Sequence, residues 1–571
     1  MTAPVRYSTW RINVLFLLLA LAVSVLLGRV VLLQLLDVDK GYQFLQNQGE
    51  QRFIRMVSED APRGEIVDRN GNQLAISTPV VTLGANPKAL LADKEGLAQV
   101  AKALSLSESA LRKKLEAKRN KGFIYLKRHM APQDAAVVLQ LDADGVRAEP
   151  SYRRYYPAGE VVAHVVGFNT VNDEGQEGLE LAFNEFLKPK RGLSRVIQDL
   201  RGNTVRELAM LESAQAGSNL VLSLDLRVQY TAYTALAEAV KASEALSGSL
   251  VLVDAKTGEI LALSNYPSYN PNNRRGLSYE FVRNRAITDA VEPGSTVKPF
   301  AVLAALEAGT FNAQSVIDTA PGRIKVEGKI LKDSRNNGEL AIGQVLAKSS
   351  QVGITKIALG TDPFDMRASF EKLGVGVSVG TGFPGEALGR LPSYAQWRDI
   401  DRATMAFGHG ISMSVLQLAQ AYQVLANGGV KIPLTLLKRD KPTYTTQAAR
   451  PENANAVLDM LGGTFIRGGT AASSALSNYA LAGKTGTAHK VGGKGYLSNK
   501  YRSLFAGFAP AESPRYVAVV MVDEPSGDRY YGGEIAAPVF SEVASLVLPY
   551  MGVKPQLGDE KTQVASLVGA L

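Results

Sequence analysis

The sequence predicts an α+β protein that one N-terminal helix anchors in a membrane and that carries two further domains. Two observations lead to this prediction. An apolar run fills residues 12–36, and behind it segments with helical spacing are interspersed with segments in which apolar and polar residues alternate. A chain of 571 residues is also too long for one ordinary core, so we expect two domains after the apolar run.

The apolar run at 12–36 is long enough to cross a bilayer. At about 1.5 Å per residue, a helix of this length exceeds the ~30 Å hydrocarbon core, and Arg29 within it can extend to the far interface. Charges flank the run, with Arg6 and Arg11 before it and Asp37 and Asp39 after it. The positive charge on the N-terminal side predicts a cytoplasmic tail and a bulk outside the cytoplasm. A cleaved signal peptide fits less well, because the run is too long and no AxA-like site follows it.

The composition excludes several classes of function. There is no cysteine, which excludes disulfides, thiol catalysis and cysteine-ligated zinc. The histidines, His129, His164, His409 and His489, are scattered and form no HExxH string, so we expect no metal and no cofactor. The formal net charge of +9 suits an anionic partner such as phospholipid headgroups. The basic residues are dispersed and form no recognition module, so we expect a lipid bilayer and no nucleic acid among the partners.

The part of the chain that follows the anchor shows no catalytic constellation. A helical pattern covers 107–118, a strand-like piece covers 80–85, and a turn at 68–71 joins two extended runs into a hairpin. A change of composition around 214–219 precedes an alternating strand and a helix, where we place the start of the second domain. The predicted division is 1–11 cytoplasmic tail, 12–36 transmembrane anchor, 37–216 N-terminal domain, 217–552 second domain and 553–571 C-terminal tail.

Three short strings in the second domain carry the residue types of covalent acyl transfer. They are Ser295-Thr296-Val297-Lys298, Ser349-Ser350-Gln351 and Lys484-Thr485-Gly486-Thr487. They are close to the SxxK, SDN and KTG set of penicillin-binding proteins and class A β-lactamases. Each string is weak alone, because SxxK recurs by chance about once or twice in a chain of this length.

A second SxxK string, from Ser369 to Lys372, shows what a chance match looks like. Apolar residues around it repeat at helical spacing, so this serine is in mid-helix, where the N–H groups are already used. Ser295 follows Glu-Pro-Gly at 292–294 and opens an apolar helix, so its hydroxyl lies among free N–H groups. Lys298 lies one turn further on the same face, where a half-buried lysine accepts a proton more readily. The alternative for this string alone is an N-capping serine beside a solvated lysine.

The KTG string also occurs twice. The copy at 256–258 lies between two strand patterns and is interpreted as a hairpin turn. Lys484 instead lies on a strand, where it supplies positive charge. Gly486 permits close approach of a substrate backbone, and Thr485 and Thr487 supply donors for a carboxylate or an oxyanion. An exposed lysine at a strand end is the alternative.

Ser349 lies between two helical patterns. At such a junction a hydroxyl can be held near a lysine from another segment of the chain. A plain helix N-cap is an equally good interpretation of this serine.

With their surroundings, these strings resemble the class B penicillin-binding proteins, and among them the septal, FtsI-like branch of penicillin-binding protein 3 type. The similarity covers nearly the whole chain, through APRGEIVDRNGNQLA, RRYYPAGEVVAHVVGF, GQEGLE, DLRVQ, RNRAITDAVEPGSTVKPF, FGHGISMSVLQLAQAY and LAGKTGTA. The resemblance implies a pedestal, dimerisation-like domain at 37–216 and a transpeptidase domain at 217–552. That second domain is expected to have a five-stranded antiparallel sheet with helices on both sides.

The resemblance also implies a reaction, in which a serine ester forms at the D-Ala-D-Ala end of a peptidoglycan stem peptide and the amine of a neighbouring stem resolves it. The implied roles are Ser295 as nucleophile, Lys298 as base, Ser349 as proton relay, Lys484 and Thr485 as carboxylate site, and the N–H groups of Ser295 and Thr487 as oxyanion hole. Gln351 and Gly486 complete the substrate-binding set. Penicillins and other β-lactams acylate the same serine.

The implied partners are an FtsW-like glycan polymerase and divisome proteins. The implied location is the cell inner membrane, with a single span and the catalytic domain in the periplasm. One residue departs from the family pattern, because Gln351 stands where the family has Asn. Its amide reaches about 1.3–1.5 Å further, whereas such a site tolerates about 0.5 Å, so we expect slower acylation.

Two other functions fit parts of the pattern. A D,D-carboxypeptidase or β-lactamase resolves the acyl-enzyme with water, but the chain has no ExxLN string to position the hydrolytic base. A non-catalytic scaffold or β-lactam sensor would keep the fold without the turnover, and Gln351 agrees with such a role.

Overall fold

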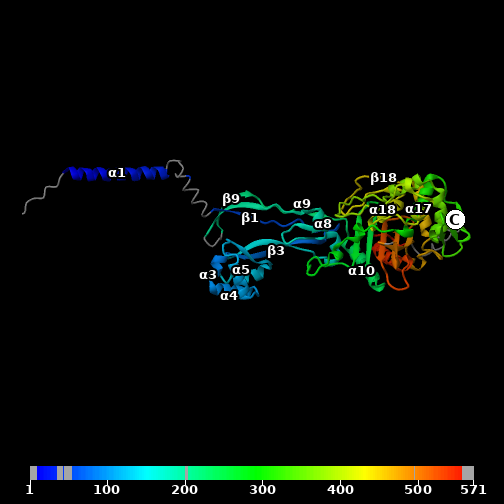
Figure 1. Ribbon diagram of the computed structural model, residues 1–571, viewed down its shortest axis with the longest axis horizontal. Helices are drawn as coiled ribbons and strands as arrows, with labels where there is room; N and C mark the ends of the chain where they lie inside the picture. Colours follow the sequence, from blue (N-terminus) through cyan, green and yellow to red (C-terminus); the bar gives the residue numbers. More distant parts are fainter. Residues whose placement is uncertain (1–8, 35–42, 44–53, 200–203, 494, 556–571) are drawn as a thin grey trace, which may run out of the picture. The chain divides into compact units, whose positions relative to one another are not determined.

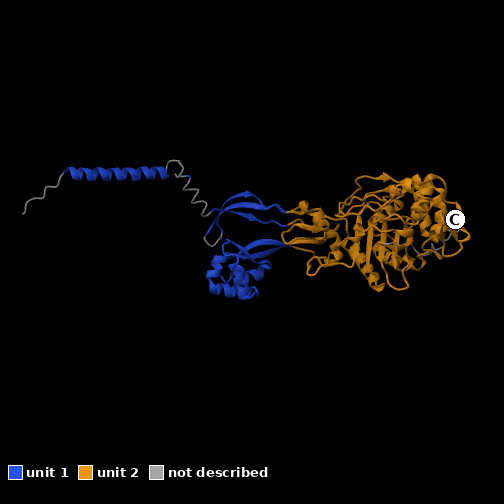
Figure 2. Ribbon diagram, viewed as in Figure 1, with its two compact units in different colours: residues 1–62, 78–153, 189–216 blue, residues 63–77, 154–188, 217–571 orange. Residues whose placement is uncertain are grey.

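The computed structural model describes residues 9–34, 43, 54–199, 204–493 and 495–555. The chain forms two compact units, shown in different colours in Figure 2. Unit 1 comprises residues 1–62, 78–153 and 189–216, and unit 2 comprises 63–77, 154–188 and 217–571. Most of the predicted tails at 1–11 and 553–571 lies outside the described residues.

The predicted membrane helix is present as α1, Thr9–Gln34 (Figure 1). None of its residues is buried in the protein, and it is long and apolar enough to cross a membrane. The last two residues of the predicted span, 35–36, lie outside the described residues. The helix therefore has the length and surface of a single-pass anchor.

Unit 1 contains a small helical layer on a mixed sheet. The helices are α3 Pro87–Ala92, α4 Lys94–Ala103, α5 Glu108–Glu116 and α6 Pro132–Leu139, and the strands are the later part of β3 Gln73–Ala85, β4 Ile124–Met130 and β5 Val146–Tyr155. The predictions of a strand at 80–85 and a helix at 107–118 are confirmed. Asn86, Asp93 and Ser107 accept N–H bonds at the starts of α3, α4 and α5, which explains where these helices begin. A separate antiparallel sheet comprises β1 Ile54–Glu59, β8 Gly192–Gln198 and β9 Thr204–Glu212.

Unit 2 is built around the antiparallel five-stranded sheet that the resemblance implied. Its strand order is β12 (Ile260–Tyr266), β11 (Ser247–Asp254), β21 (Tyr516–Asp523), β20 (Gly495–Ala509) and β19 (Ala482–Gly492). Both faces are buried, because alternate residues of each strand enter different cores. Leu250 and Leu252 contact α10 Leu226–Ala242 and α20 Gly532–Tyr550, whereas Val251 and Val253 lie in the core with α13 Lys298–Ala308 and α18 Val415–Ala426. Helices thus cover both sides, and β19 forms one edge of the sheet.

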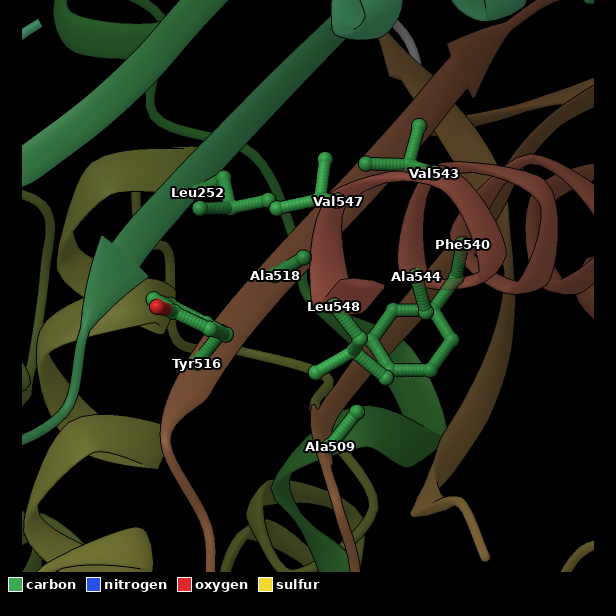
Figure 3. A pocket seen from close by; sticks show the side chains of 9 residues that line it. All are labelled: Leu252, Ala509, Tyr516, Ala518, Phe540, Val543, Ala544, Val547 and Leu548. Carbon is green, nitrogen blue, oxygen red and sulfur yellow. The ribbon is translucent and has the colours of Figure 1, made fainter. Parts of the chain in front are cut away.

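Figure 3 shows how α20 packs on the sheet. Phe540, Val543 and Val547 of the helix face Leu252 and Ala518 of the strands around a cavity of about 10 Å³. A space this small holds at most one water, and its lining is almost entirely apolar. The cavity is therefore a packing feature and offers no ligand site.

The remaining elements of unit 2 surround this sheet. In order they are β2 Ile66–Val67, α7 Ala163–Val166, β6 Phe168–Asn169, β7 Gly175–Glu177, α8 Gly178–Ala182, α9 Asn184–Leu187, β10 Leu220–Val221, α11 Tyr279–Val282, α12 Arg285–Thr288, β13 Val316–Asp318, β14 Arg323–Val326, β15 Lys329–Lys332, β16 Glu339–Ala341, α14 Ile342–Ala347, α15 Gln351–Gly360, α16 Pro363–Leu373, α17 Asp399–Met405, β17 Val430–Lys431, β18 Thr446–Gln447 and α19 Pro451–Gly462. The 3₁₀ turns are η1 Gly159–Val161, η2 Gly294–Val297, η3 Tyr394–Gln396 and η4 Ala472–Ser474.

Two segments that precede residue 217 belong to unit 2. A buried ion triad holds them together: Glu180 accepts hydrogen bonds from Arg63 at 2.7 Å and from Arg154 at 2.6 Å. The predicted turn after β2 is also present, with Gly71 at a φ of +87° and Asp68 accepting the N–H of Asn72 at 2.8 Å. The sequence strings of this part of the chain that resemble the family therefore stabilise the fold.

Candidate active site

Ser295 lies in the 3₁₀ turn η2, which leads directly into α13. Gly294 adopts a φ of +57°, a conformation that favours glycine, and turns the chain into the helix. The buried hydroxyl of Tyr422 in α18 donates to the Thr296 carbonyl at 2.8 Å and so fixes the turn. The prediction of a helix start is confirmed, although α13 begins only at Lys298. The alternative of an N-capping serine beside a solvated lysine is wrong, because the N-cap positions of η2 and α13 are Pro293 and Val297 and Lys298 is buried.

The second SxxK serine has different surroundings. Ser369 lies inside α16 and is 8% exposed, as its helical pattern predicted. Lys372 is exposed on the same helix. This copy therefore has neither free N–H groups around the serine nor a buried base.

Lys298 is fully buried at the start of α13. Its Nζ donates to the carbonyl oxygen of Ser349 at 2.5 Å and to Ser349 Oγ at 3.0 Å. Burial lowers the pKa of Lys298 to about 7, and the negative charge of Asp333 opposes this shift. The neutral form of Lys298 is therefore accessible near pH 7, as a general base requires.

Ser349 lies between α14 and α15 with a φ of +55°. Its Oγ accepts hydrogen bonds from Lys298 and from Lys484, both at 3.0 Å. The N-cap of α15 is the next residue, Ser350, whose Oγ accepts the Gly353 N–H at 2.9 Å. Ser349 therefore keeps its own O–H free to donate, and the structure favours the junction interpretation over the N-cap.

Lys484 extends from the edge strand β19 and is fully buried, so the alternative of an exposed strand-end lysine is wrong. Burial, and secondly repulsion from Lys298, hold the pKa of Lys484 well below its usual range. Two ammonium groups that share one hydroxyl repel each other, so the pair favours a state in which one lysine is neutral.

The rest of the KTG string lines the same edge. Thr485 Oγ1 donates to Thr470 Oγ1 at 2.8 Å, and Thr487 Oγ1 accepts the Gly532 N–H at 3.1 Å. A Cβ at Gly486 would lie 2.9 Å from Thr296 Cγ2 in η2, the turn that carries Ser295. The lack of a side chain at Gly486 thus lets β19 approach η2, a reason that the sequence did not indicate.

Asp333 is the residue of the site that sequence reasoning missed. Its carboxylate accepts the Ser350 hydroxyl at 2.6 Å and the backbone N–H groups of Gln351 and Val352 at 2.6 and 3.0 Å. These bonds hold the start of α15, and with it the left-handed turn that presents Ser349 to the lysines. The only signal in the sequence is a polar run after β15, which does not tell which helix the aspartate caps.

Gln351 is the first residue of α15 and is half-buried. Among the residues that the structure describes, its side-chain amide has no hydrogen-bond partner, whereas its backbone N–H donates to Asp333. The amide that departs from the family pattern is therefore available to a substrate.

A helix-start serine, two buried lysines and a bridging hydroxyl beside a sheet edge define a serine acyl-transfer enzyme. The sequence matches the penicillin binding protein transpeptidase domain over residues 248–545 and the penicillin-binding protein dimerisation domain over residues 58–222. The chain belongs to the penicillin-binding protein family. The two matches agree with the prediction of a dimerisation-like domain followed by a transpeptidase domain.

Similar proteins cover nearly the full chain. A probable peptidoglycan D,D-transpeptidase, PbpC of Pseudomonas aeruginosa, is 39% identical over 96% of this chain and 96% of its own. The peptidoglycan D,D-transpeptidase FtsI of Escherichia coli is also 39% identical, over 96% of this chain and 93% of its own. Penicillin-binding protein 3 of Mycobacterium tuberculosis, solved with aztreonam, is 27% identical with a TM-score of 0.69 and covers 88% of this chain and 99% of its own.

Proposed function

We propose that the protein is a peptidoglycan D,D-transpeptidase that cross-links stem peptides through an acyl-serine intermediate in septal wall synthesis. One observation carries this proposal: Ser349 Oγ lies 3.0 Å from both Lys298 Nζ and Lys484 Nζ, on the two elements that flank Ser295. This arrangement supplies a base, a proton relay and a positive site in one buried cluster.

In the first step, neutral Lys298 takes the proton of Ser295 as Oγ attacks the D-Ala-D-Ala carbonyl. The N–H groups of Ser295 and Thr487 stabilise the oxyanion. Ser349, which is bonded to both lysines, passes a proton to the leaving amine, and D-Ala departs. The result is an ester on Ser295. A β-lactam also forms an ester on this serine, but its leaving amine stays attached because it is part of the opened ring.

The substrate's terminal carboxylate is bound on the other side of the site. Lys484 contributes positive charge there and Thr485 a hydroxyl, and the edge position of β19 leaves room for an extended peptide to lie along the strand. Gln351 extends its amide toward the same peptide. In the second step an amine of a neighbouring stem attacks the ester, and the cross-link forms.

The location and partners complete the proposal. The charges around α1 support a cytoplasmic N-terminus and a periplasmic catalytic domain at residues 217–552. Within the predicted domain at 37–216, unit 1 is the proposed pedestal, whereas residues 63–77 and 154–188 belong to unit 2. An FtsW-like polymerase supplies the glycan strands, and divisome proteins recruit the enzyme to the septum. Protease added to spheroplasts is expected to digest the chain beyond residue 36, and complete protection would contradict this orientation.

The test of the function combines a fluorescent penicillin with a cross-linking assay on the full-length protein in detergent. A transpeptidase gives a stable fluorescent band and forms dimeric muropeptides from lipid-linked glycan that carries pentapeptides. A band that fades within minutes indicates a hydrolase. A stable band without dimers indicates a β-lactam sensor, and absence of the band indicates a scaffold.

A further inference from the structure

A carboxylate lies just before the nucleophile and takes no part in the acylation described above. Glu292, three residues before Ser295, is half-buried. It accepts the Gly410 N–H at 2.9 Å and the Tyr496 hydroxyl at 3.1 Å. None of the ion pairs between described residues includes Glu292. Its negative charge is thus held in place by neutral donors and is open to a cation.

Aromatic rings surround this carboxylate. The His409 ring lies edge-on to Tyr496 with centroids 5.7 Å apart, and its Nδ1 is buried without a hydrogen-bond partner within the described chain. Burial lowers the pKa of His409, and the negative charge of Glu292 opposes this shift. The His489 ring lies 6.3 Å from Tyr496 and 4.7 Å from Tyr501. A carboxylate beside aromatic rings is an environment that suits an ammonium group, which is attracted both by the negative charge and by ring faces.

The cluster lies further along β19 than the KTG string and includes a residue three positions before Ser295. His489 is on β19 and shares a strand face with Thr485 and Thr487, because side chains alternate along a strand. A Cβ at Gly294 would lie 3.3 Å from Ala488 Cβ, so the strand passes beside the nucleophile's turn at this point. A molecule at Glu292 is therefore near Ser295, outside the carboxylate site of the first substrate.

The second half of the reaction needs such a position. The acceptor is an amine, which is an ammonium ion at pH 7 and is repelled by the positive charge that Lys484 contributes to the donor site. We propose that Glu292, together with Tyr496, His409 and His489, receives the ammonium group of the acceptor stem peptide. This inference rests on the proposed transpeptidase function and names the site of its second substrate.

The protons balance in this arrangement. Glu292 holds the ammonium group by its charge, the ammonium releases one proton to solvent, and the free amine attacks the ester carbonyl. The C–N bond forms and the bond from carbon to Ser295 Oγ breaks. The second amine proton goes through Lys298 to Ser295 Oγ, which leaves an amide, a free serine and one released proton.

The test measures how the acyl-enzyme divides between an amine and water. The full-length protein in detergent is acylated by a peptide thioester donor, and a stem tripeptide with a free side-chain amine is the acceptor. Glu292→Gln should lower the ratio of aminolysis to hydrolysis at least tenfold and raise the acceptor concentration for half-maximal transfer. Tyr496→Phe should lower the ratio about two- to fivefold. The matched control is Glu386→Gln, a loop carboxylate that also accepts backbone N–H bonds.

Penicillin acylation of each variant separates this inference from the proposed function. If penicillin does not acylate the wild-type protein, both the proposed transpeptidase function and the acceptor site are overturned. Labelled variants with an unchanged ratio overturn only the acceptor site. If Glu292→Gln melts at a lower temperature or fails to fold, the Tyr496→Phe ratio decides, because its side chain lies on an exposed part of β20.

Discussion

The two SxxK strings have the same pattern in two regions of unit 2, and only one of them has the surroundings of a nucleophile. Ser295 lies in a turn before a helix, and Lys298 of its string is fully buried. Lys298 contacts the Ser349 hydroxyl, which Lys484 also contacts. Ser369 lies inside a helix, and its lysine is exposed to solvent. The comparison teaches that the reactivity of this string comes from burial of the lysine and from unpaired N–H groups, neither of which the string itself contains.

The two KTG strings differ in the same way. Lys484 is buried beside Ser349, whereas Lys256 is exposed and donates to Asn427 at 3.1 Å in a turn. The turn copy occupies the β11–β12 hairpin, where Gly258 has a φ of +73°. Burial of the lysine beside Ser349 thus separates the candidate substrate site from a chain reversal.

The largest expected effect tests the difference between Ser295 and Ser369 directly. Ser295→Ala should abolish labelling by fluorescent penicillin, because the covalent route is lost. Ser369→Ala should label like the wild type. Mass spectrometry of the labelled protein should find the adduct on the peptide that contains Ser295. An adduct at Ser369 would contradict the assignment of the nucleophile.

The next effect concerns the lysines. Lys298→Met should lower the acylation rate by about 10³-fold or more, whereas Lys372→Met should leave it within about twofold. The wild-type rate should rise with pH to half its plateau near pH 7, since the base is the neutral lysine and its pKa is lowered to about 7. A half-plateau near pH 10 would mean that Lys298 is solvated in solution.

A smaller effect is expected at Asp333. Asp333→Asn weakens the cap on α15 by ~1–2 kcal/mol, so acylation should slow about 5- to 30-fold. The half-plateau pH should also fall, because the lost negative charge raises the pKa of Lys298 in the wild type.

The matched control for Asp333 is Asp362→Asn, the cap of α16, where Asp362 accepts the Phe364 N–H at 2.8 Å. This control should leave both the rate and the half-plateau pH in place. If Asp333→Asn slows acylation but leaves the pH of half-maximal acylation unchanged, Asp333 acts only as a structural cap.

The smallest effect tests the departure from the family pattern. Gln351→Asn should raise the second-order acylation rate by about 2- to 13-fold, since one misplaced neutral hydrogen bond is worth ~0.5–1.5 kcal/mol. Stopped-flow acylation by a chromogenic cephalosporin measures the rate. An equal or lower rate would mean that the pocket has adapted to glutamine.

Local patterns predicted much of the fold and several site positions. Helical spacing placed Ser369 in mid-helix, and the hairpins at 68–71 and 256–258 were recognised from their turn residues. The resemblance supplied the five-stranded sheet. Asp333 was missed because it caps a helix 18 residues further along the chain, and no local pattern encodes that pairing.

The sequence by itself determined the anchor, the alternation of helices and strands, and the chemical types of the acyl-transfer residues, because these depend on neighbours within a few positions. Only the tertiary structure decided which lysines are buried and that Lys298 and Lys484, from a helix and a strand nearly 200 residues apart, share the Ser349 hydroxyl. The physical reason is that desolvation and charge repulsion act through space. The lowered lysine pKa values therefore belong to the packed site and to no segment of the chain alone.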